Sequence, residues 1–374
     1  MSRKPGSAAS KPRRGFDRER AQWVASALTP WFLATQRDLS WRRTRDPYAV
    51  WVSEVMLQQT RVETVERYWS EFIARFPDVG TLAAAETDEV LAAWSGLGYY
   101  RRARLLHQGA KLVVAELGAQ LPRDADGLRR IPGIGAYTAG AIASIAYDQP
   151  EPLVDGNVAR VLARFEAVGT PSEQLATAPW LWDGCAAILR EGSPRILGQA
   201  LMELGATVCT PRVPRCAACP LAEHCRAKAA GVTAEIPGVR ERAASPTERW
   251  WALALMHDDA VLLVQRGEAG LLARMWCLPL VAIPEASTVP DRTAVAAIAM
   301  GKLGSLRPIG APVVHLFTHR RWEVHVVVAS VRSATPLRDP LTPQTWLREH
   351  ERPAGGLPTL TRKLLARVWA QATV

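Results

Sequence analysis

The first two thirds of the chain carry apolar side chains at the spacing of amphipathic helices. Between residues 17 and 228 such segments follow one another, and a period of about 3.6 residues predicts helices. In the clearest segment the recurring apolar residues are Val62, Val65, Trp69, Phe72, Ile73 and Phe76. Further helices are predicted over residues 46–59, 87–95, 101–116 and 158–166. An all-α body is therefore expected.

Polar residues mark where some of these helices begin. Asp46 followed by Pro47 is typical of a helix start, because Asp accepts from free backbone amides and Pro has no amide to leave unpaired. Thr87 is predicted to cap the short helix that stops at Gly96.

The pattern changes after Cys225. Residues 229–248 lack periodicity and are predicted to be a linker. Beyond them, β-branched and alternating segments predict strands over 250–256, 261–265, 313–318 and 322–331, and helical spacing recurs over 292–303 and 359–372. The sequence thus predicts a multi-domain chain, with a helical body at residues 16–228 and a smaller α+β domain at residues 249–374.

Composition narrows the class of protein. The 374 residues are 48% hydrophobic, enough for two or three packed domains. No apolar run reaches membrane length, and residues 1–15 are expected to be a disordered basic arm rather than a signal peptide. The net charge of +10 suits an anionic partner. We expect a cytoplasmic monomer, associated with the nucleoid if bacterial.

Four of the six cysteines lie within seventeen residues: Cys209, Cys216, Cys219 and Cys225. Such clustering predicts the ligands of one metal centre, since disulfides are unusual without a secretory signal. Zinc sites usually pair two C-x2-C units. One tight C-x2-C with wider arms suits a 4Fe–4S cluster, with one cysteine per iron. Zinc stays the alternative. His224 could serve zinc as a ligand, although it is expected to be exposed.

A second signal lies at Ile131–Gly135, a tight turn between two predicted helices. Gly133 and Gly135 would let backbone amides approach a phosphate. This is the pattern of a helix-hairpin-helix, which grips DNA without reading its sequence. An ordinary corner between helices is the alternative. Asp155 follows twenty residues after Gly135, and the cysteines follow in turn.

Three segments carry a resemblance to a known family: Trp51–Thr60, Gly96–Tyr100 and Val154–Val158. With the hairpin and the cysteines, they resemble the iron–sulfur helix-hairpin-helix glycosylases of the endonuclease III superfamily. Within that superfamily they are most similar to the adenine DNA glycosylase (MutY) family. The resemblance implies an enzyme that hydrolyses N-glycosyl bonds and removes adenine paired with 8-oxoguanine or guanine in double-stranded DNA.

The residues themselves indicate two carboxyls with different environments. Glu54 lies among Val52, Val55 and Met56, and an apolar setting raises a carboxyl pKa. Asp155 precedes a predicted helix, whose N-terminus favours an ionised carboxylate. An acid paired with a charge stabiliser fits glycosidic cleavage. A surface glutamate and a plain helix cap are the alternatives.

The resemblance assigns further roles. Glu54 would be the general acid and Asp155 the stabiliser of the sugar cation. Asn157 would orient water or the sugar. Tyr137 stands where bifunctional lyases carry a lysine, so a monofunctional enzyme is implied, with the tyrosine hydroxyl close to Asp155. Gln59, Leu97 and Tyr99 would insert into DNA. The adenine pocket would be lined by Arg37, Leu39, Trp41, Arg42 and Gln199.

Residues 249–374 resemble a Nudix-like domain without the run of glutamates that Nudix hydrolysis needs, so recognition rather than hydrolysis is implied. Phe317, Thr318 and His319 match a loop that reads 8-oxoguanine, although an incidental strand end is the alternative. Two other functions stay open on the sequence alone. One is a glycosylase-lyase for oxidised pyrimidines, disfavoured by Tyr137. The other is a non-enzymatic iron–sulfur regulator that binds DNA.

Overall fold

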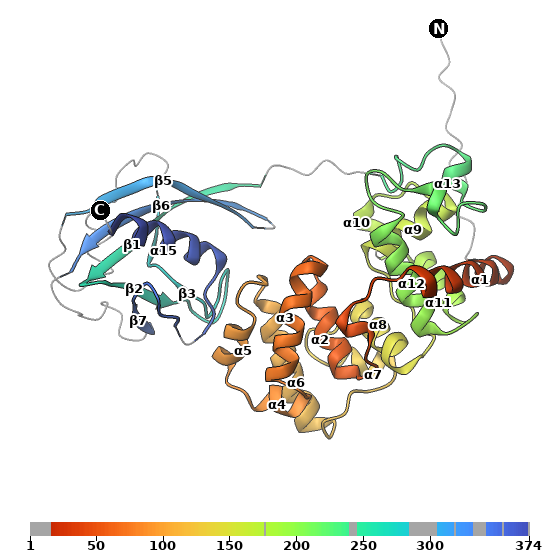
Figure 1. The fold of residues 1–374 in the computed structure, drawn as a ribbon, viewed down its shortest axis with the longest axis horizontal. Coiled ribbons are helices and arrows are strands. Elements are labelled where there is room, and N and C mark those ends of the chain that lie inside the picture. The colour runs from red at the N-terminus through yellow and green to blue at the C-terminus, as the bar shows by residue number, and fades with distance from the viewer. Residues whose placement is uncertain are drawn as a thin grey trace, which may run out of the picture. The chain divides into compact units, whose positions relative to one another are not determined.

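A computed structural model describes residues 16–175, 177–238, 245–283, 305–317, 319–331, 342–353 and 355–372 (Figure 1). The chain forms two compact units. The first holds the residues up to 73, 78–80 and 108–241, and the second holds 74–77, 81–107 and 242–374. Helices make up the first unit, and a sheet dominates the second. The expected fold class, a helical body followed by an α+β domain, is confirmed.

The predicted helices are present in the described part of the chain. The longer ones are α1 (Arg18–Thr35), α2 (Pro47–Leu57), α3 (Val62–Arg75), α6 (Arg101–Glu116), α8 (Ala136–Tyr147), α9 (Gly156–Glu166), α11 (Pro179–Leu189) and α12 (Pro194–Thr207). Shorter turns of helix are η1 (Ser40–Arg42), α4 (Val79–Ala84), α5 (Thr87–Ala93), α7 (Ala125–Leu128), α10 (Ser172–Leu175), η2 (Cys216–Ala218) and α13 (Arg226–Ala229).

Helix α2 lies at the centre of the first unit because it is apolar on nearly every side. A helix without a polar face has no surface to offer water and becomes part of the core. It packs against α8, and α12 packs against α1, α8 and α9. Every residue of α2 from Tyr48 to Met56 is buried, including Ser53 and Glu54. The apolar surroundings of Glu54 therefore follow from the sequence of its own helix.

Caps fix where several helices begin. The Asp46 side chain accepts from the backbone amides of Tyr48 and Ala49, as predicted. For α5 the prediction was wrong. Glu86, not Thr87, is the cap, and the Glu89 carboxylate accepts a hydrogen bond from the Glu86 amide. This reciprocal pair is a capping box with a glutamate in the first position, where Ser or Thr is usual.

A close backbone approach brings the start of α9 onto α8. A side chain at Gly140 would place its Cβ only 1.9 Å from the carbonyl oxygen of Pro152. Only glycine lets the segment before Asp155 lie this near to the helix. Asp155 is consequently held beside α8, the helix that also carries Tyr137.

The sheet of the second unit has the strand order β3-β2-β1-β6-β5, with β4 also pairing with β1 and β7 with β2. Its strands are β1 (Thr247–His257), β2 (Ala260–Gln265), β3 (Trp276–Cys277), β4 (Leu280–Ala282), β5 (Arg307–Leu316), β6 (Arg321–Ser330) and β7 (Gln344–Leu347). Strands β1 and β6 are parallel, with Trp250 opposite Val324, and the other pairs are antiparallel. Helix α15 (Thr359–Ala372) packs Leu360, Leu364 and Val368 into the core of the sheet.

Two boundaries differ in detail from the predictions. Strand β1 begins at Thr247, within the segment expected to be linker. Before it, Ile236 is buried and its carbonyl accepts from Arg164, so this part of the segment packs on the first unit. The helix predicted over 292–303, the N-terminal arm at residues 1–15 and residues 239–244 of the linker lie outside the described residues. Among the residues that are described, no helix has the length and apolar character needed to cross a membrane.

Candidate active site

One pocket of the first unit gathers most of the residues predicted to act on the base. Its volume is about 640 Å³. The predicted residues that line it are Arg37, Leu39, Trp41, Arg42, Glu54, Gln59, Tyr137, Asp155, Asn157 and Gln199. They come from η1, α2, α8, α9, α12 and the loops beside them. Segments separated by up to 160 residues in the sequence thus meet at a single cavity.

Glu54 is a buried carboxyl with one strong partner. Its exposed fraction is 4%. Tyr137 donates a hydrogen bond of 2.6 Å from its hydroxyl to Glu54 Oε2. Burial raises the pKa of Glu54 to about 7, the Tyr137 hydrogen bond opposes this, and the negative charge of Asp155 adds to the rise. Asp155 accepts three hydrogen bonds and Glu54 accepts one, so the carboxylate form is better stabilised at Asp155, and Glu54, with its pKa raised to about 7, is the carboxyl that retains a proton.

Asp155 caps helix α9 with its whole carboxylate. Its Oδ1 accepts from the backbone amides of Asn157 at 2.9 Å and Val158 at 2.7 Å, and its Oδ2 accepts from Asn157 Nδ2 at 2.8 Å. The helix start therefore lies where the sequence predicts it. The N-terminus of a helix alone would lower the pKa of Asp155, but the pKa is raised instead. Burial raises the pKa of Asp155, while the three hydrogen bonds and Arg160 act to lower it.

Tyr137 contacts Glu54 rather than Asp155. Its hydroxyl donates to Glu54 and lies 3.2 Å from Met202 Sδ. A hydroxyl near Asp155 was expected, but the hydrogen bond goes to Glu54, and Asp155 acts on Tyr137 only through its charge. Burial and both carboxylates raise the pKa of Tyr137. The phenol is consequently a neutral donor throughout the physiological range.

Sequence reasoning missed Glu203, which lies in the same pocket. Its side chain is 1% exposed and accepts from Arg37 and Arg42, each at 2.7 Å. Burial acts to raise the pKa of Glu203, but the hydrogen bonds from the two arginines outweigh it and bring the pKa to about 2. The signal was a carboxylate between Met202 and Leu204 in an apolar helix, since a buried charge needs partners.

The other pocket residues are held by neighbours. Trp41 is 6% exposed and packs edge-on against Trp69, with ring centroids 6.3 Å apart. Gln199 is 6% exposed and donates to the Arg195 carbonyl at 3.0 Å. Asn157 uses both ends of its amide, because Oδ1 accepts from Arg160 Nη2 at 2.7 Å while Nδ2 donates to Asp155. Asn157 therefore orients the Asp155 carboxylate in this structure.

The four clustered cysteines line one small cavity: Cys209, Cys216, Cys219 and Cys225. Burial raises the pKa of Cys219 to about 11, and the other three cysteines act in the same direction. Among the described residues, no group of three or more His, Cys, Asp or Glu side chains is arranged to hold a metal ion. The side chain of His224 is exposed, as predicted, and stacks edge-on against Trp23.

Helix α9 links this cavity to the pocket. Arg160 donates to the Cys209 carbonyl at 2.8 Å and to Asn157. One turn later, Arg164 donates to Cys209 Sγ at 3.4 Å and to the Thr210 and Pro211 carbonyls. Arg164 is 1% exposed, so its charge is satisfied by these acceptors in the interior. Arg164 thus places a positive charge beside the sulfur atoms of this cavity, and such a charge favours anionic sulfur ligands.

The hairpin has the predicted geometry. The turn joins α7 to α8, Gly133 has φ of +84° and Gly135 is the N-cap of α8. Nothing lies within 4 Å of the place where a Gly135 side chain would begin. Both glycines are exposed. The turn therefore offers open backbone at a helix N-terminus, as phosphate binding needs.

The predicted wedge residues differ in exposure. Tyr99 is 48% exposed with φ of +49°, and Gln59 is exposed with φ of +58°. Leu97, by contrast, is only 5% exposed. As placed here, its side chain faces the interior rather than a ligand. The apolar character that suggested a wedge also suits a core residue, and sequence does not separate the two.

The predicted lesion-reading loop is described only in part. Phe317 is half-buried and packs edge-on against Trp322 and His315, at centroid distances of 5.0 and 4.6 Å. His319 is exposed, and Thr318 lies outside the described residues. Phe317 thus belongs to the packing of the sheet, while His319 is open to solvent.

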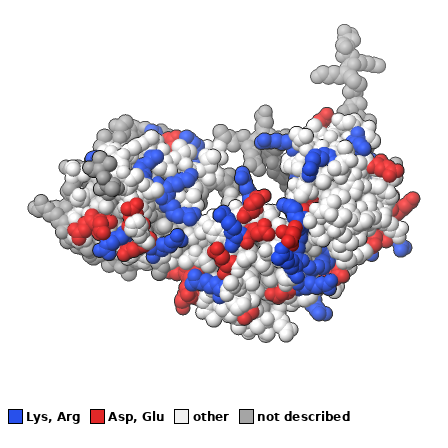
Figure 2. All heavy atoms as spheres, viewed as in Figure 1, with Lys and Arg blue, Asp and Glu red and all other residues white. Residues whose placement is uncertain are grey.

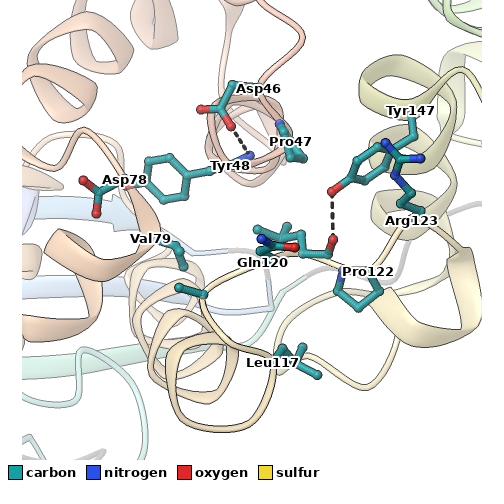
Figure 3. Close-up of a pocket in the computed structure, with 12 residues that line it drawn as sticks. Asp46, Pro47, Tyr48, Asp78, Val79, Leu117, Gln120, Pro122, Arg123 and Tyr147 are labelled. Atoms are coloured by element: carbon teal, nitrogen blue, oxygen red, sulfur yellow. Dashed lines mark hydrogen bonds between the residues drawn. The ribbon is translucent and has the colours of Figure 1, made fainter.

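A second pocket of the first unit, of about 620 Å³, contains none of the predicted site residues (Figure 3). In it the Tyr147 hydroxyl donates to the Leu121 carbonyl at 2.8 Å, and Arg123 lies over the Tyr147 ring. Figure 2 shows Lys and Arg side chains in several groups on one face, with Asp and Glu between them. The charge of the chain is not concentrated in one patch of that face.

Two protein families match the chain, one over part of the helical unit and one over the sheet. Residues 52–182 match the HhH-GPD superfamily of base excision DNA repair proteins, and residues 250–367 match the NUDIX domain. A solved thermostable thymine-DNA glycosylase is similar to the chain with a TM-score of 0.53 and 26% identity, covering 57% of this chain and 98% of that one. The fold and pocket define a helix-hairpin-helix DNA glycosylase with a Nudix-like domain.

Two relatives that match by sequence narrow this class. The chain is 35% identical to the adenine DNA glycosylase of Homo sapiens, covering 90% of this chain and 72% of that protein. It is 46% identical to the adenine DNA glycosylase of Mycolicibacterium smegmatis over 59% of this chain and 75% of that protein. The chain belongs to the adenine DNA glycosylase family, and it is an enzyme that removes adenine from DNA.

The Tyr137–Glu54 hydrogen bond predicts a shift in the pH dependence of excision. The bond lowers the pKa of Glu54, so Tyr137→Phe should raise that pKa. If Glu54 acts as an acid, excision falls as pH rises through about 7 in the wild type. In Tyr137→Phe the fall should begin at higher pH. Single-turnover rates from pH 5 to 9 measure both midpoints. A midpoint that is unchanged, or moves to lower pH, contradicts this assignment.

Proposed function

We propose that the enzyme excises adenine opposite 8-oxoguanine or guanine, with Glu54 as the general acid and Asp155 as the stabiliser of the sugar cation. The observation that carries the proposal is the pair itself. Glu54 has a pKa of about 7 and shares one pocket with a carboxylate that ionises before it. Two carboxyls with different protonation states suit a reaction that needs a proton and a negative charge at once.

In the proposed reaction, the bond between the adenine nitrogen and the sugar carbon breaks. Its electron pair goes to the base, which takes the proton of Glu54 and leaves neutral. The sugar becomes an oxocarbenium ion, and the carboxylate of Asp155 stabilises its positive charge. Water then adds to the sugar carbon and gives its proton to the Glu54 carboxylate, which leaves an abasic site and restores the acid. General acid catalysis of this kind contributes about 100- to 10,000-fold.

Asn157 and Tyr137 support the two carboxyls in this proposal. Asn157 fixes the orientation of Asp155 through its amide, and Tyr137 holds the proton-bearing Glu54 through a 2.6 Å hydrogen bond. Tyr137 has no amine with which to form a Schiff base. The enzyme is therefore proposed to be monofunctional, leaving the strand uncut.

The lesion specificity is proposed to lie in the second unit. His319 is exposed beside the half-buried Phe317, and an imidazole can hydrogen-bond the edge of a base. In this proposal the loop of Phe317, Thr318 and His319 reads 8-oxoguanine on the opposite strand. Gln59, Tyr99 and the Gly133–Gly135 turn hold the duplex while adenine enters the pocket lined by Arg37, Leu39, Trp41, Arg42 and Gln199.

A 4Fe–4S cluster is proposed at Cys209, Cys216, Cys219 and Cys225. Four sulfurs around one cavity, with Arg164 donating to Cys209 Sγ, support it. When bound, the cluster would supply a rigid cross-link between the ends of the 209–225 segment. The chain's own residues do the chemistry, and Arg160 and Arg164 fasten that segment to α9.

The mispair assay tests the proposed reaction. Duplexes with adenine opposite 8-oxoguanine, guanine or thymine are incubated with wild-type protein and with Glu54→Gln. Wild type should excise adenine fastest opposite 8-oxoguanine, and the strand should break only after alkali or heat. Glu54→Gln keeps the shape and hydrogen-bonding capacity of the side chain but has no acidic proton. Excision should fall by at least about 100-fold, with DNA affinity retained.

The matched control is Glu63→Gln, the same change at a glutamate in the first turn of α3. It should excise at the wild-type rate. Near-normal excision by Glu54→Gln would rule out its role as the acid. Strand cleavage without alkali, with a borohydride-trapped adduct, would contradict monofunctional chemistry.

The cluster predicts a metal content that can be measured without activity. Anaerobically purified protein should be yellow-brown and hold about four irons, one for each cysteine ligand. Cys216→Ala should lose iron, whereas Cys277→Ala should keep it, because Cys277 is buried in the sheet unit and lies outside the cavity. One zinc per chain and no iron would contradict the proposal.

A further inference from the structure

The exposed Tyr99 lies in a loop that does not follow the usual backbone preferences. Gly96, Gly98 and Tyr99 have φ of +119°, +70° and +49°. The left-handed region costs a tyrosine energy that glycine does not pay. The neighbouring side chains point the other way, since Leu97 and Tyr100 are 5% and 6% exposed. The surroundings must therefore hold this loop with Tyr99 outward.

Arg102 holds the loop from inside. Its Nη2 donates to the carbonyls of Leu97 at 3.3 Å and Gly98 at 3.2 Å, and its guanidinium lies 5.4 Å from the centroid of the Tyr99 ring. Trp94 Nε1 also donates to the Gly98 carbonyl at 3.2 Å. Arg102 is 8% exposed, so it is not available to bind phosphate as an open side chain would be.

A second hold comes from a residue far away in the sequence. The carbonyl of Leu357 accepts from Ser95 Oγ at 3.1 Å and from the Tyr100 hydroxyl at 3.3 Å. Ser95 and Tyr100 are the residues on either side of Tyr99's turn. One carbonyl in the segment before α15 thus joins both ends of the loop. All these residues belong to the second compact unit.

The segment that supplies this carbonyl is itself fixed to the sheet. The amide of Trp276, in β3, donates to the Gly356 carbonyl at 3.0 Å. Nearby, Arg104 of α6 donates to the Ala273 carbonyl at 2.6 Å, and Arg274 pairs with Asp88 of α5 at 3.5 Å. The α5–α6 segment and the sheet are therefore joined at several points, and at one of them the Leu357 carbonyl contacts both residues that flank the loop.

We propose that the Leu357 carbonyl, with Ser95 and Tyr100, is a link through which the Nudix-like domain positions Tyr99 for insertion into DNA. Ser95 and Tyr100 are positioning residues in this scheme, because they act on the duplex only through the turn between them. The inference rests on the proposed role of Tyr99 as a DNA wedge. The new element is that the position of Tyr99 depends on the Nudix-like domain, which is proposed to read the lesion.

The test removes the two donors from the full-length protein with Ser95→Ala/Tyr100→Phe. The DNA carries 2-aminopurine next to 8-oxoguanine, so that its fluorescence reports insertion of a side chain, and excision is followed on the same duplex. Loss of two hydrogen bonds should slow both processes by about tenfold. Tyr99→Ala should slow them at least as much. In the Tyr99→Ala background, Ser95→Ala/Tyr100→Phe should add nothing, since the donors act through Tyr99.

Tyr147→Phe is the matched control, because it removes a tyrosine-to-carbonyl hydrogen bond in the other unit. It should leave both rates unchanged even if it lowers the melting temperature. Equal slowing by Ser95→Ala/Tyr100→Phe with and without Tyr99 would overturn the link and make the bonds merely structural. Wild-type insertion and excision by Ser95→Ala/Tyr100→Phe while Tyr99→Ala is slow would also overturn it, leaving the wedge intact. Wild-type insertion by Tyr99→Ala would overturn the role of Tyr99 as a wedge. The proposed excision of adenine would stand or fall separately, because its rate is measured independently on the same duplex.

Discussion

The site depends on keeping one carboxyl protonated while a second, ionised carboxyl lies in the same pocket. Burial within an apolar helix makes ionisation of Glu54 unfavourable and raises its pKa. The negative charge of Asp155 raises this pKa further. Burial raises the pKa of Asp155 as well, but three hydrogen-bond donors at the start of α9 oppose this rise by stabilising the carboxylate. The fold serves this difference. Helix α2 is central because of its sequence, and Gly140 lets the segment before Asp155 approach α8.

A second level of structure orients these groups. Asn157 and Arg160 connect the Asp155 carboxylate to the carbonyl of Cys209. Glu203 pairs with Arg37 and Arg42, which line the same pocket. Glu203 offsets part of this positive charge, and Arg42 lowers the pKa of Glu54 by less than burial raises it. Glu203, Asp155 and Arg164 all have hydrogen-bond partners, which offset part of the cost of burying their charges.

Sequence predicted the features that are local in the chain. Asp46 with Pro47 and Asp155 with Asn157 are contacts within three residues, and both helix starts were found. The four cysteines were found because their spacing is itself the signal. Family motifs supplied Glu54 and Tyr137, but not the hydrogen bond between them, which joins residues 83 apart. Glu203 and the burial of Leu97 were missed for the same reason, since partners and exposure are set by distant packing. At Glu86, the capping residue departed from the usual Ser or Thr.

The most direct test of this account is a titration of Glu54 in the free protein. Side-chain ¹³C NMR of labelled glutamate, with the Glu54 signal assigned by its loss in Glu54→Gln, reports the protonation state without any substrate. The account predicts a midpoint near pH 7, set by burial and by the charge of Asp155. A midpoint near the ordinary glutamate value of about 4.3 would show that Glu54 is already ionised at neutral pH. The proton for the leaving base would then have to come from another group.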